Sequence, residues 1–356
     1  MANDLYNSFL SLIRLGLGHD THPIHTSYDW EAIDALAVQH GLSAVMVDGV
    51  ECLPEEFRPP KGTLLKWIGE SLQDYEYRYD LYCKAIAELA GFYNSHGYKM
   101  MVLKGYSCSL NWPNPKHRPC GDIDIWQFGQ QKKADEALKE KGIKVDNSHH
   151  HHTVFAWKEF TVENHYDFIN VHHHKSHRGI EEMLKNLGKD DSHYVELRGE
   201  RVYIPSPNLH ALFLLRHALN HFTSIGINFR QVLDWAFFVK EHKMEVDWKW
   251  FHSVVDEYHM RDFYNCLNAI CVEELGFDAC IFPSVQFLPS QKELVLMEIL
   301  HPRYTLEEPN NFIKRYIYKY KRWKGNAWKQ KLCYDESRWS AFFSGVKTHL
   351  ISPDFI

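Results

Sequence analysis

The stretch Met100-Met-Val-Leu-Lys-Gly-Tyr-Ser107, followed by Arg118-Pro-Cys-Gly-Asp-Ile-Asp-Ile-Trp126, decides the fold that we predict for this chain. Residues 100–103 are apolar and follow the helix-stop signal His96-Gly97. This pattern predicts a short buried strand. The strand would deliver Lys104 and Gly105 to a turn at its end.

A second strand is predicted over residues 122–126, after a polar and Pro-rich loop. Successive side chains on a strand alternate between its faces, so Asp122 and Asp124 face one side while Ile123 and Ile125 face the other. We expect the isoleucines in a core and the aspartates on a shared surface. The alternative is an ordinary half-solvated strand, because alternating Asp and Ile is common on antiparallel sheets.

Two neighbouring carboxylates repel each other and raise each other's pKa unless a cation lies between them. Mg²⁺ is bound through one or two carboxylates and the oxygens of substrate phosphates. The pair Asp122 and Asp124 therefore predicts phosphoryl chemistry that depends on Mg²⁺, with Mn²⁺ as a substitute. Gly121 has no Cβ and would let a phosphate approach the backbone. Lys104 and Arg118 are the cations available for the phosphates.

These residues resemble the nucleotidyltransferases of the DNA polymerase β superfamily. Within it, the chain is similar to the family of uncharacterised nucleotidyltransferases that is found often in bacterial polysaccharide gene clusters. The superfamily pattern is a Gly-Ser or Gly-Gly turn, a spacer, Asp-x-Asp, and a third carboxylate on a neighbouring strand. Here the turn reads Lys104-Gly105-Tyr106-Ser107, which departs from Gly-Ser and matches the Leu-Lys-Gly variant of this family.

The resemblance is specific over residues 102–167. It implies a polymerase β-like fold with a bound nucleotide, and catalytic, metal-binding carboxylates at Asp122 and Asp124. The residues that it assigns to nucleotide binding are Lys104, Gly105, Ser107, Arg118, Gly121 and His165.

The third carboxylate is expected on the second strand of a hairpin that β-branched and aromatic residues predict over 149–157 and 160–169. Glu163 and Asp167 are the candidates. We choose Glu163 as catalytic residue and metal ligand, because Val162-Glu-Asn-His-Tyr166 resembles the family's Val-Glu-x-His segment. Both candidates face the same side of a strand, so their spacing leaves the choice open.

The composition is that of a folded protein with a large core: 356 residues, of which 45% are hydrophobic and 14% aromatic. A formal net charge of -6 argues against a chain built as a whole to hold nucleic acid. The eight cysteines form no Cys-x-x-Cys pair. No basic leader and no run of about eighteen apolar residues occurs. We therefore expect a cytoplasmic protein without a transmembrane segment.

The predicted fold class is α+β. A small mixed β-sheet nucleotidyltransferase core, 98–205, lies between an N-terminal helical region, 1–97, and a C-terminal helical region, 206–356. Ser206-Pro207 reads as the N-cap and first residue of a helix. Helical spacing or composition also predicts helices over 5–13, 30–37, 63–95 and 131–140. We expect the first three of these to pack on the catalytic sheet.

Histidine runs at 149–152 and 172–174, with His177 close behind, keep a zinc hydrolase as an alternative. Adjacent residues on a strand diverge to opposite faces, which argues against converging zinc ligands. Contacts to phosphates or to an acceptor, or plain polar roles near a charged site, are the other interpretations.

Two pairs on the predicted C-terminal helices have helical spacing. His217 and His221 have the spacing of a zinc-binding helix but lack the glutamate base, so core positions are favoured. Arg230 and Asp234 stand at i, i+4 and can form an ion pair. An ordinary surface pair is favoured, and a supporting role beside the nucleotide is the alternative.

Segment 314–331 carries eight Lys or Arg and five Tyr or Trp, with no acidic residue. Basic residues interleaved with aromatic ones can bind single-stranded nucleic acid, a membrane surface or an anionic glycan. We expect an anionic partner here, with a solvated helix face as the alternative.

The expected reaction moves a nucleoside monophosphate from a nucleoside triphosphate to a hydroxyl of an unidentified acceptor, with a small molecule or glycan favoured. Pyrophosphate is released. The main alternative is a non-catalytic nucleotide- or glycan-binding adaptor that keeps the same fold. A nucleic-acid enzyme that acts through segment 314–331 is a third interpretation.

Overall fold

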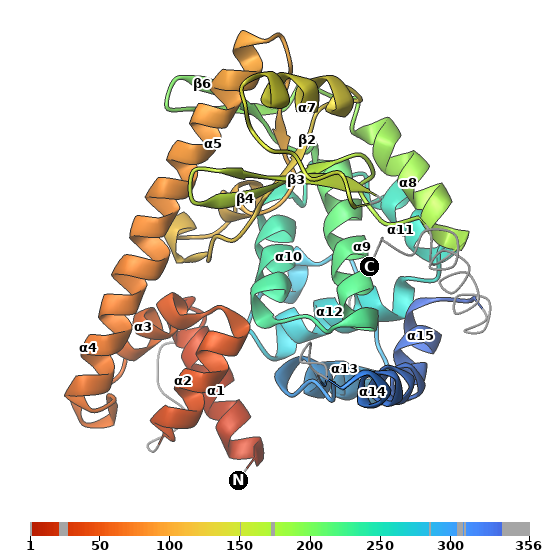
Figure 1. Cartoon of the computed structure of the whole chain (residues 1–356). Coiled ribbons are helices and arrows are strands. Elements are labelled where there is room, and N and C mark those ends of the chain that lie inside the picture. Colours follow the sequence, from red (N-terminus) through yellow and green to blue (C-terminus); the bar gives the residue numbers. More distant parts are fainter. Residues whose placement is uncertain are drawn as a thin grey trace.

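The computed structural model describes residues 2–20, 28–149, 151–171, 175–284, 286–304, 309 and 311–336. Over these residues a six-stranded mixed sheet is flanked by helices on both faces (Figure 1). The α+β class expected from the sequence is confirmed.

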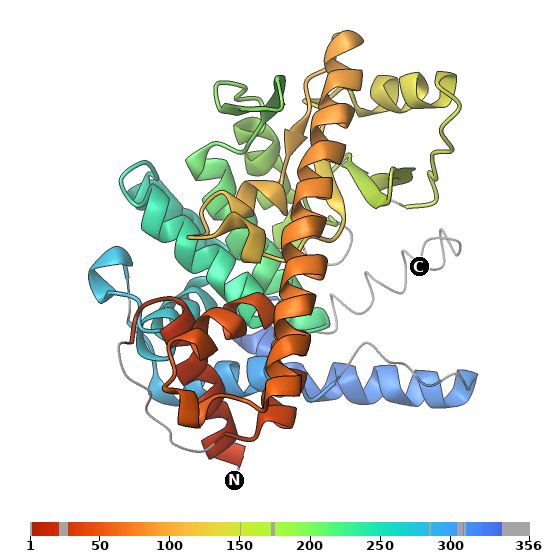
Figure 2. The same ribbon diagram turned by 90° about the vertical axis from the view of Figure 1, so that its left-hand side faces the viewer.

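The elements before the sheet are α1 (Ala2–Gly16), α2 (Trp30–His40), α3 (Ser43–Glu51), η1 (Glu55–Phe57), α4 (Lys61–Glu70), the π-helical η2 (Ser71–Tyr77) and α5 (Arg78–Ser95). The last three follow one another without a gap and form one long helical rod, as predicted for 63–95 (Figure 2).

The strands and the helices among them are β1 (Met101–Val102), α6 (Tyr106–Ser109), η3 (Pro115–His117), β2 (Ile123–Trp126), α7 (Gln131–Glu140), β3 (His152–Trp157), β4 (Phe160–His165), α8 (Lys175–Leu187), β5 (Tyr194–Leu197) and β6 (Glu200–Tyr203). The strand order in the sheet is β3-β4-β2-β1-β6-β5. β2 pairs antiparallel with β1 and parallel with β4, and β3 and β4 form the predicted hairpin.

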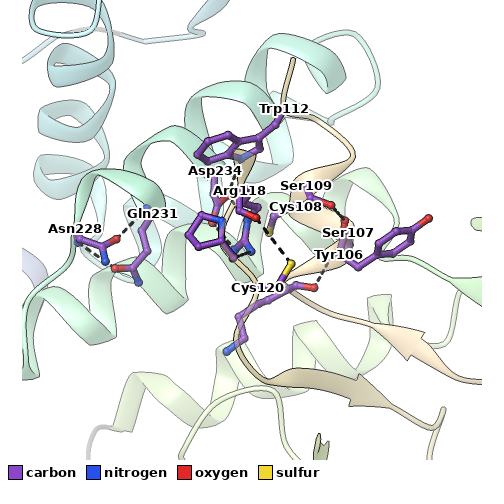
Figure 3. Close-up of polar contacts among 12 residues, drawn as sticks. Tyr106, Ser107, Cys108, Ser109, Trp112, Arg118, Cys120, Asn228, Gln231 and Asp234 are labelled. Carbon is purple, nitrogen blue, oxygen red and sulfur yellow. Dashed lines mark hydrogen bonds and ion pairs between the residues drawn. The ribbon is translucent and has the colours of Figure 1, made fainter. Parts of the chain in front are cut away.

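After the sheet come α9 (Pro207–Ser224), α10 (Phe229–His242), α11 (Trp248–Glu257), α12 (Arg261–Glu273), η4 (Ala279–Ile281), α13 (Pro289–Leu300), α14 (Phe312–Gly325) and α15 (Ala327–Cys333). Pro207 is the first residue of α9, but Ser206 makes no side-chain cap hydrogen bond, contrary to expectation. Asn228 and Gln231 form a capping box that starts α10 (Figure 3).

The two faces of the sheet lie in different cores, because side chains alternate along each strand. Ile123 and Ile125 of β2 pack in one core with residues of α5 and α7. Trp126 of β2 belongs to a second core that contains much of α9 and α10. Asp124 shares the face of Trp126, so the C-terminal helices cover the face on which the carboxylate lies.

The N-terminal helices do not all pack where the sequence analysis placed them. α5 contacts the sheet as expected, through Val202 of β6 and its neighbours. α1 instead contacts α10, where the rings of Phe9 and Phe229 lie 6.2 Å apart between centroids. None of the described helices combines the length and apolar character that crossing a bilayer requires.

Candidate active site

The register of two parallel strands builds the centre of the site. Asp124 of β2 lies opposite Glu163 of β4, and Trp126 lies opposite His165. Equivalent positions on neighbouring strands face the same way, so the side chains converge. One ligand atom each from Asp124, Glu163 and His165 lies within 4.8 Å of the others. The described residues therefore contain a compact group of two carboxylates and an imidazole.

Asp124 is almost fully buried, with 2% of its side chain exposed. Its Oδ1 lies 2.9 Å from Lys104 Nζ and 2.9 Å from His165 Nε2. Burial opposes ionisation, yet the Lys104 charge and the His165 hydrogen bond hold the pKa of Asp124 well below its usual range. Both contacts fall on Oδ1, which leaves Oδ2 for a ligand.

His165 links the two carboxylates. Besides Asp124, its Nε2 lies 3.5 Å from Glu163 Oε2, while Nδ1 lies 3.2 Å from the carbonyl oxygen of Asp167. Burial alone would favour neutral imidazole, but hydrogen bonds to Asp124 and Glu163 raise the pKa of His165 to about 9. Lys104 and His165 are thus the cations that balance the carboxylates in this structure.

The cluster fits a divalent metal ion. Carboxylate oxygens suit Mg²⁺ and Mn²⁺, and the His165 imidazole adds a ligand that transition metals also accept once it has lost its proton. A hydrogen bond to His165 lowers the pKa of Glu163, which keeps its carboxylate ionised and able to bind a cation. The chemistry of the donors does not by itself choose among these ions.

Asp122 lies at the edge of this group, one residue before β2, and is exposed. It lines the same pocket as Asp124. Partial burial of its carboxyl group and the Asp124 charge raise the pKa of Asp122. The structure thus places the predicted aspartate pair along one pocket wall, with Asp124 inside and Asp122 toward solvent.

Asp167, the other candidate for the third carboxylate, lies beyond the end of β4. Its carboxylate pairs with Lys185 of α8, one turn after Glu181, whose own carboxylate accepts backbone N–H bonds from Phe168 and Ile169. These contacts fasten the segment after β4 to α8. Glu163, not Asp167, is the carboxylate that stands in register with Asp124.

The turn after β1 requires glycine. Gly105 has a positive φ of 60°, and a Cβ there would lie 2.2 Å from the Tyr82 hydroxyl oxygen. That hydroxyl donates a 2.9 Å hydrogen bond to the carbonyl oxygen of Asp122. Ser107 is buried on α6, and its hydroxyl contacts the Lys104 carbonyl oxygen at 3.5 Å. Ser107 thus contacts the backbone of the turn.

Arg118 occupies a place that the sequence did not indicate. Its Nε and Nη2 donate to the two carboxylate oxygens of Asp234 on α10, each at 2.8 Å, and Nη1 donates to the Pro119 carbonyl oxygen (Figure 3). Trp112 Nε1 donates to the same carboxylate at 2.9 Å. Asp234 therefore pairs with Arg118, and the predicted pair of Asp234 with Arg230 is wrong.

One pocket collects most of these residues, and the C-terminal helices supply one of its walls. The residues that line it from the sheet and from the segment between β1 and β2 are Lys104, Gly105, Cys108, Arg118, Gly121, Asp122 and Asp124. The residues that line it from α9 and α10 are Leu214, His217, Ala218, Arg230, Gln231 and Asp234. In the sequence, only the possible role of Arg230 and Asp234 beside the nucleotide pointed to contact between these helices and the site.

Histidines of β3 and of α9 lie near the site. His152 of β3 lies with Nε2 4.0 Å from Glu163 Oε1, and burial lowers its pKa to about 4. On α9, burial and then the Lys104 charge hold the pKa of His217 well below its ordinary value, and burial lowers that of His221 to about 4. Residues 150 and 172–174 lie outside the described part of the chain.

Comparison with known families agrees with this geometry. No curated protein and no solved structure matches the chain significantly. A family model described as uncharacterised nucleotidyltransferase matches residues 26–276, which include all the residues of the pocket. The match covers well over half of the sequence, so the chain belongs to this family of nucleotidyltransferases.

Proposed function

We propose that this protein is a metal-dependent nucleotidyltransferase with a polymerase β-like site. It moves a nucleoside monophosphate from a nucleoside triphosphate to a hydroxyl of a small-molecule or glycan acceptor and releases pyrophosphate. The observation that carries the proposal is the register of Asp124 with Glu163, which brings two carboxylates together beside the Lys104-Gly105 turn. Membership of the family supports nucleotidyl transfer in general.

Asp122, Asp124 and Glu163 would hold two Mg²⁺ or Mn²⁺ ions. When bound, such ions neutralise the charge of the triphosphate and lower the pKa of the acceptor hydroxyl. Asp124 fits this role because Oδ2 carries neither of its two contacts in the described chain. Glu163 fits it because the pKa of its carboxyl group is lowered.

The remaining residues of the site bind and orient the nucleotide. Lys104 lines the pocket with its ammonium group 2.9 Å from Asp124, a position from which it also reaches phosphate oxygens placed against that carboxylate. A Cβ at Gly121 would meet nothing within 4 Å, so the backbone there is open to a close phosphate. His217, held neutral by burial, contributes a hydrogen-bonding group without added positive charge.

We also propose an anionic partner for the basic segment 314–331. We place the contact on the part of that segment that lies in α14. α14 extends from the body of the molecule and carries exposed Lys314, Lys321 and Lys324 (Figure 2). Lys329 of α15 is buried and lies 2.8 Å from Glu298, so it does not belong to this surface. A glycan acceptor with acidic groups suits such a helix, and its binding would weaken steeply with salt.

The cytoplasm is the compartment that we propose. All eight cysteines are free thiols, as expected where the environment is reducing.

Calorimetric titration tests the nucleotide site directly. Non-hydrolysable analogues of the four nucleoside triphosphates are titrated into wild type and Asp122→Ala with Mg²⁺ present. We expect one or more analogues to bind wild type only with the metal, and to bind Asp122→Ala at least about tenfold more weakly. Binding without turnover in any acceptor assay would favour the adaptor. The absence of binding for all four would contradict the proposal.

A further inference from the structure

A triphosphate brings several negative charges into the pocket, and the described structure offers few cations to meet them. Lys104 is already close to Asp124. Arg118 is the second cation expected for the phosphates. Its three side-chain nitrogens donate hydrogen bonds to Asp234 and Pro119, and the residue is 6% exposed. Releasing it would leave the Asp234 carboxylate buried without its charge partner, which is costly. Apart from the proposed metal ions, a side-chain cation for the phosphates must therefore be sought elsewhere in the pocket.

Among the described residues that line the pocket, Arg230 is the basic side chain that remains. It lies one turn before Asp234 on α10 and lines the same wall, opposite Lys104 and Asp122. Because Asp234 is occupied by Arg118, the neighbour at i+4 gives Arg230 no ion pair. Its Nε is buried and has no hydrogen-bond partner among the described residues.

The surroundings of Arg230 are unfavourable for a guanidinium whose Nε has no acceptor among the described residues. Burial, and then the charge of Arg118, lower the pKa of Arg230, although the charges of Asp234 and Asp122 oppose this. A buried donor without an acceptor is rare in folded proteins because its desolvation is not recovered. An anion in the pocket would supply both the missing hydrogen-bond acceptor and the missing charge.

We infer that Arg230 binds the β- and γ-phosphates of the nucleoside triphosphate. The inference rests on the proposed function and adds a residue that resemblance to the family had not assigned. Guanidinium groups bind phosphate oxygens in a two-pronged geometry. The Asn228–Gln231 capping box and the Arg118–Asp234 pair fix the start of α10, so the guanidinium is held in place before the ligand arrives. The N-terminus of α10 adds a positive dipole on the same side.

The experiment compares ligands with and without the terminal phosphates. Non-hydrolysable nucleoside triphosphate, pyrophosphate and nucleoside monophosphate are titrated with Mg²⁺ into wild type, Arg230→Gln, Arg230→Lys and Asp124→Asn. Lys240→Gln removes the same charge from an exposed position on the same helix and is the matched control. Melting temperatures are measured in parallel. Because Arg230 Nε has no hydrogen-bond partner in the described part of the chain, we expect Arg230→Gln to melt no lower than wild type.

We expect Arg230→Gln to bind the triphosphate analogue and pyrophosphate at least about tenfold more weakly, and the monophosphate within about twofold of wild type. The triphosphate affinity of Arg230→Lys should lie between those of wild type and Arg230→Gln, and the affinity of Lys240→Gln should match wild type. Unchanged triphosphate affinity in Arg230→Gln, with loss in Asp124→Asn, would overturn the inference and keep the proposed function. An equal loss for all three ligands would also overturn it. Failure of wild type to bind any of them would overturn both.

Discussion

Asp124 and Asp234 are both buried aspartates that pair with a cation from the segment between β1 and β2, yet they are bonded differently. Asp234 uses both carboxylate oxygens, for two Arg118 nitrogens and Trp112 Nε1. Asp124 places both of its contacts, with Lys104 and His165, on Oδ1 alone. Both oxygens of Asp234 are thus engaged, whereas Oδ2 of Asp124, a residue that lines the pocket, takes part in neither of these contacts.

This difference suits Asp234 to a structural role and Asp124 to a role in binding a metal ion. A carboxylate whose two oxygens are both held in a bidentate pair joins two segments and has little left to offer a ligand. A carboxylate with one bonded oxygen can accept a metal ion at the other while its partners keep it ionised. Four changes test whether the distinction holds.

The largest effect is expected from Asp234→Asn. The substitution leaves Arg118 buried without a charge partner and should lower the free energy of unfolding by about 3–5 kcal/mol. Urea denaturation measures this loss. The control is Asp256→Asn, which breaks the exposed pair of Asp256 with Arg261, 2.7 Å apart, and should cost less than about 1 kcal/mol. Equal losses in the two variants would remove the structural role assigned to Asp234.

Asp124→Asn should instead damage the reaction. We expect pyrophosphate release from the nucleotide that binds to fall at least about a hundredfold, or about 2.7 kcal/mol, because a metal-ligating charge is lost. Ile125→Val, on the opposite face of the same strand, should lower the free energy of unfolding by about 0.5–1.5 kcal/mol and leave the rate unchanged. Full activity in Asp124→Asn would refute the catalytic assignment of β2.

Gly105→Ala tests the turn that carries Lys104 toward Asp124. Positive φ and the approach of a Cβ to within 2.2 Å of the Tyr82 hydroxyl should together lower the free energy of unfolding by about 1–3 kcal/mol. Adding Tyr82→Phe removes the clashing oxygen, so the double variant should recover part of the loss in a double-mutant cycle. Strict additivity of the two single changes would show that the hydroxyl is not what excludes a side chain.

The smallest effect is expected from Asp48, a carboxylate that is less buried than Asp124 and Asp234. Asp48 of α3 is part-exposed and lies 2.6 Å from His117, which also lies 3.7 Å from Glu76. Burial opposes it, but the hydrogen bond and charge of Asp48 raise the pKa of His117 above its ordinary 6.5. A raised folded pKa gives stability that is full below 6.5 and lost as the pH rises through the folded value.

In wild type, the melting temperature should therefore decline as the pH rises from about 6.5, and His117→Asn and Asp48→Asn should each make this decline smaller. We expect the pair to contribute less than about 1 kcal/mol to the free energy of unfolding. Melts at several pH values measure it. A decline of the same size in wild type and in both variants would assign the pH dependence to other groups.

Patterns within one strand were enough to predict the sheet side of the site. Alternation in residues 122–126 predicted β2, the burial of Ile123 and Ile125, and a separate face for Asp124, because strand geometry is a local property. The hairpin of β3 and β4 followed from β-branched and aromatic composition. The α+β class followed from the order of these segments.

Pairings between distant segments could not be predicted in the same way. Arg118 and Asp234 are 116 positions apart, and nothing local shows that one will bind the other. The helical spacing of Arg230 and Asp234 even favoured a wrong pair, since a bidentate buried partner competes better than a neighbour on the same helix. The covering of the carboxylates by α9 and α10 depends on how both cores pack, and therefore on the whole fold.

Titration with Mn²⁺, followed by electron paramagnetic resonance, separates the two kinds of carboxylate directly. If the group of Asp124, Glu163 and His165 is a metal site, wild type binds Mn²⁺ and Asp124→Asn binds it at least about tenfold more weakly. Asp234→Asn, measured well below its melting temperature, should bind it as wild type does. Undiminished Mn²⁺ binding in Asp124→Asn would contradict the metal site and, with it, the proposed transferase.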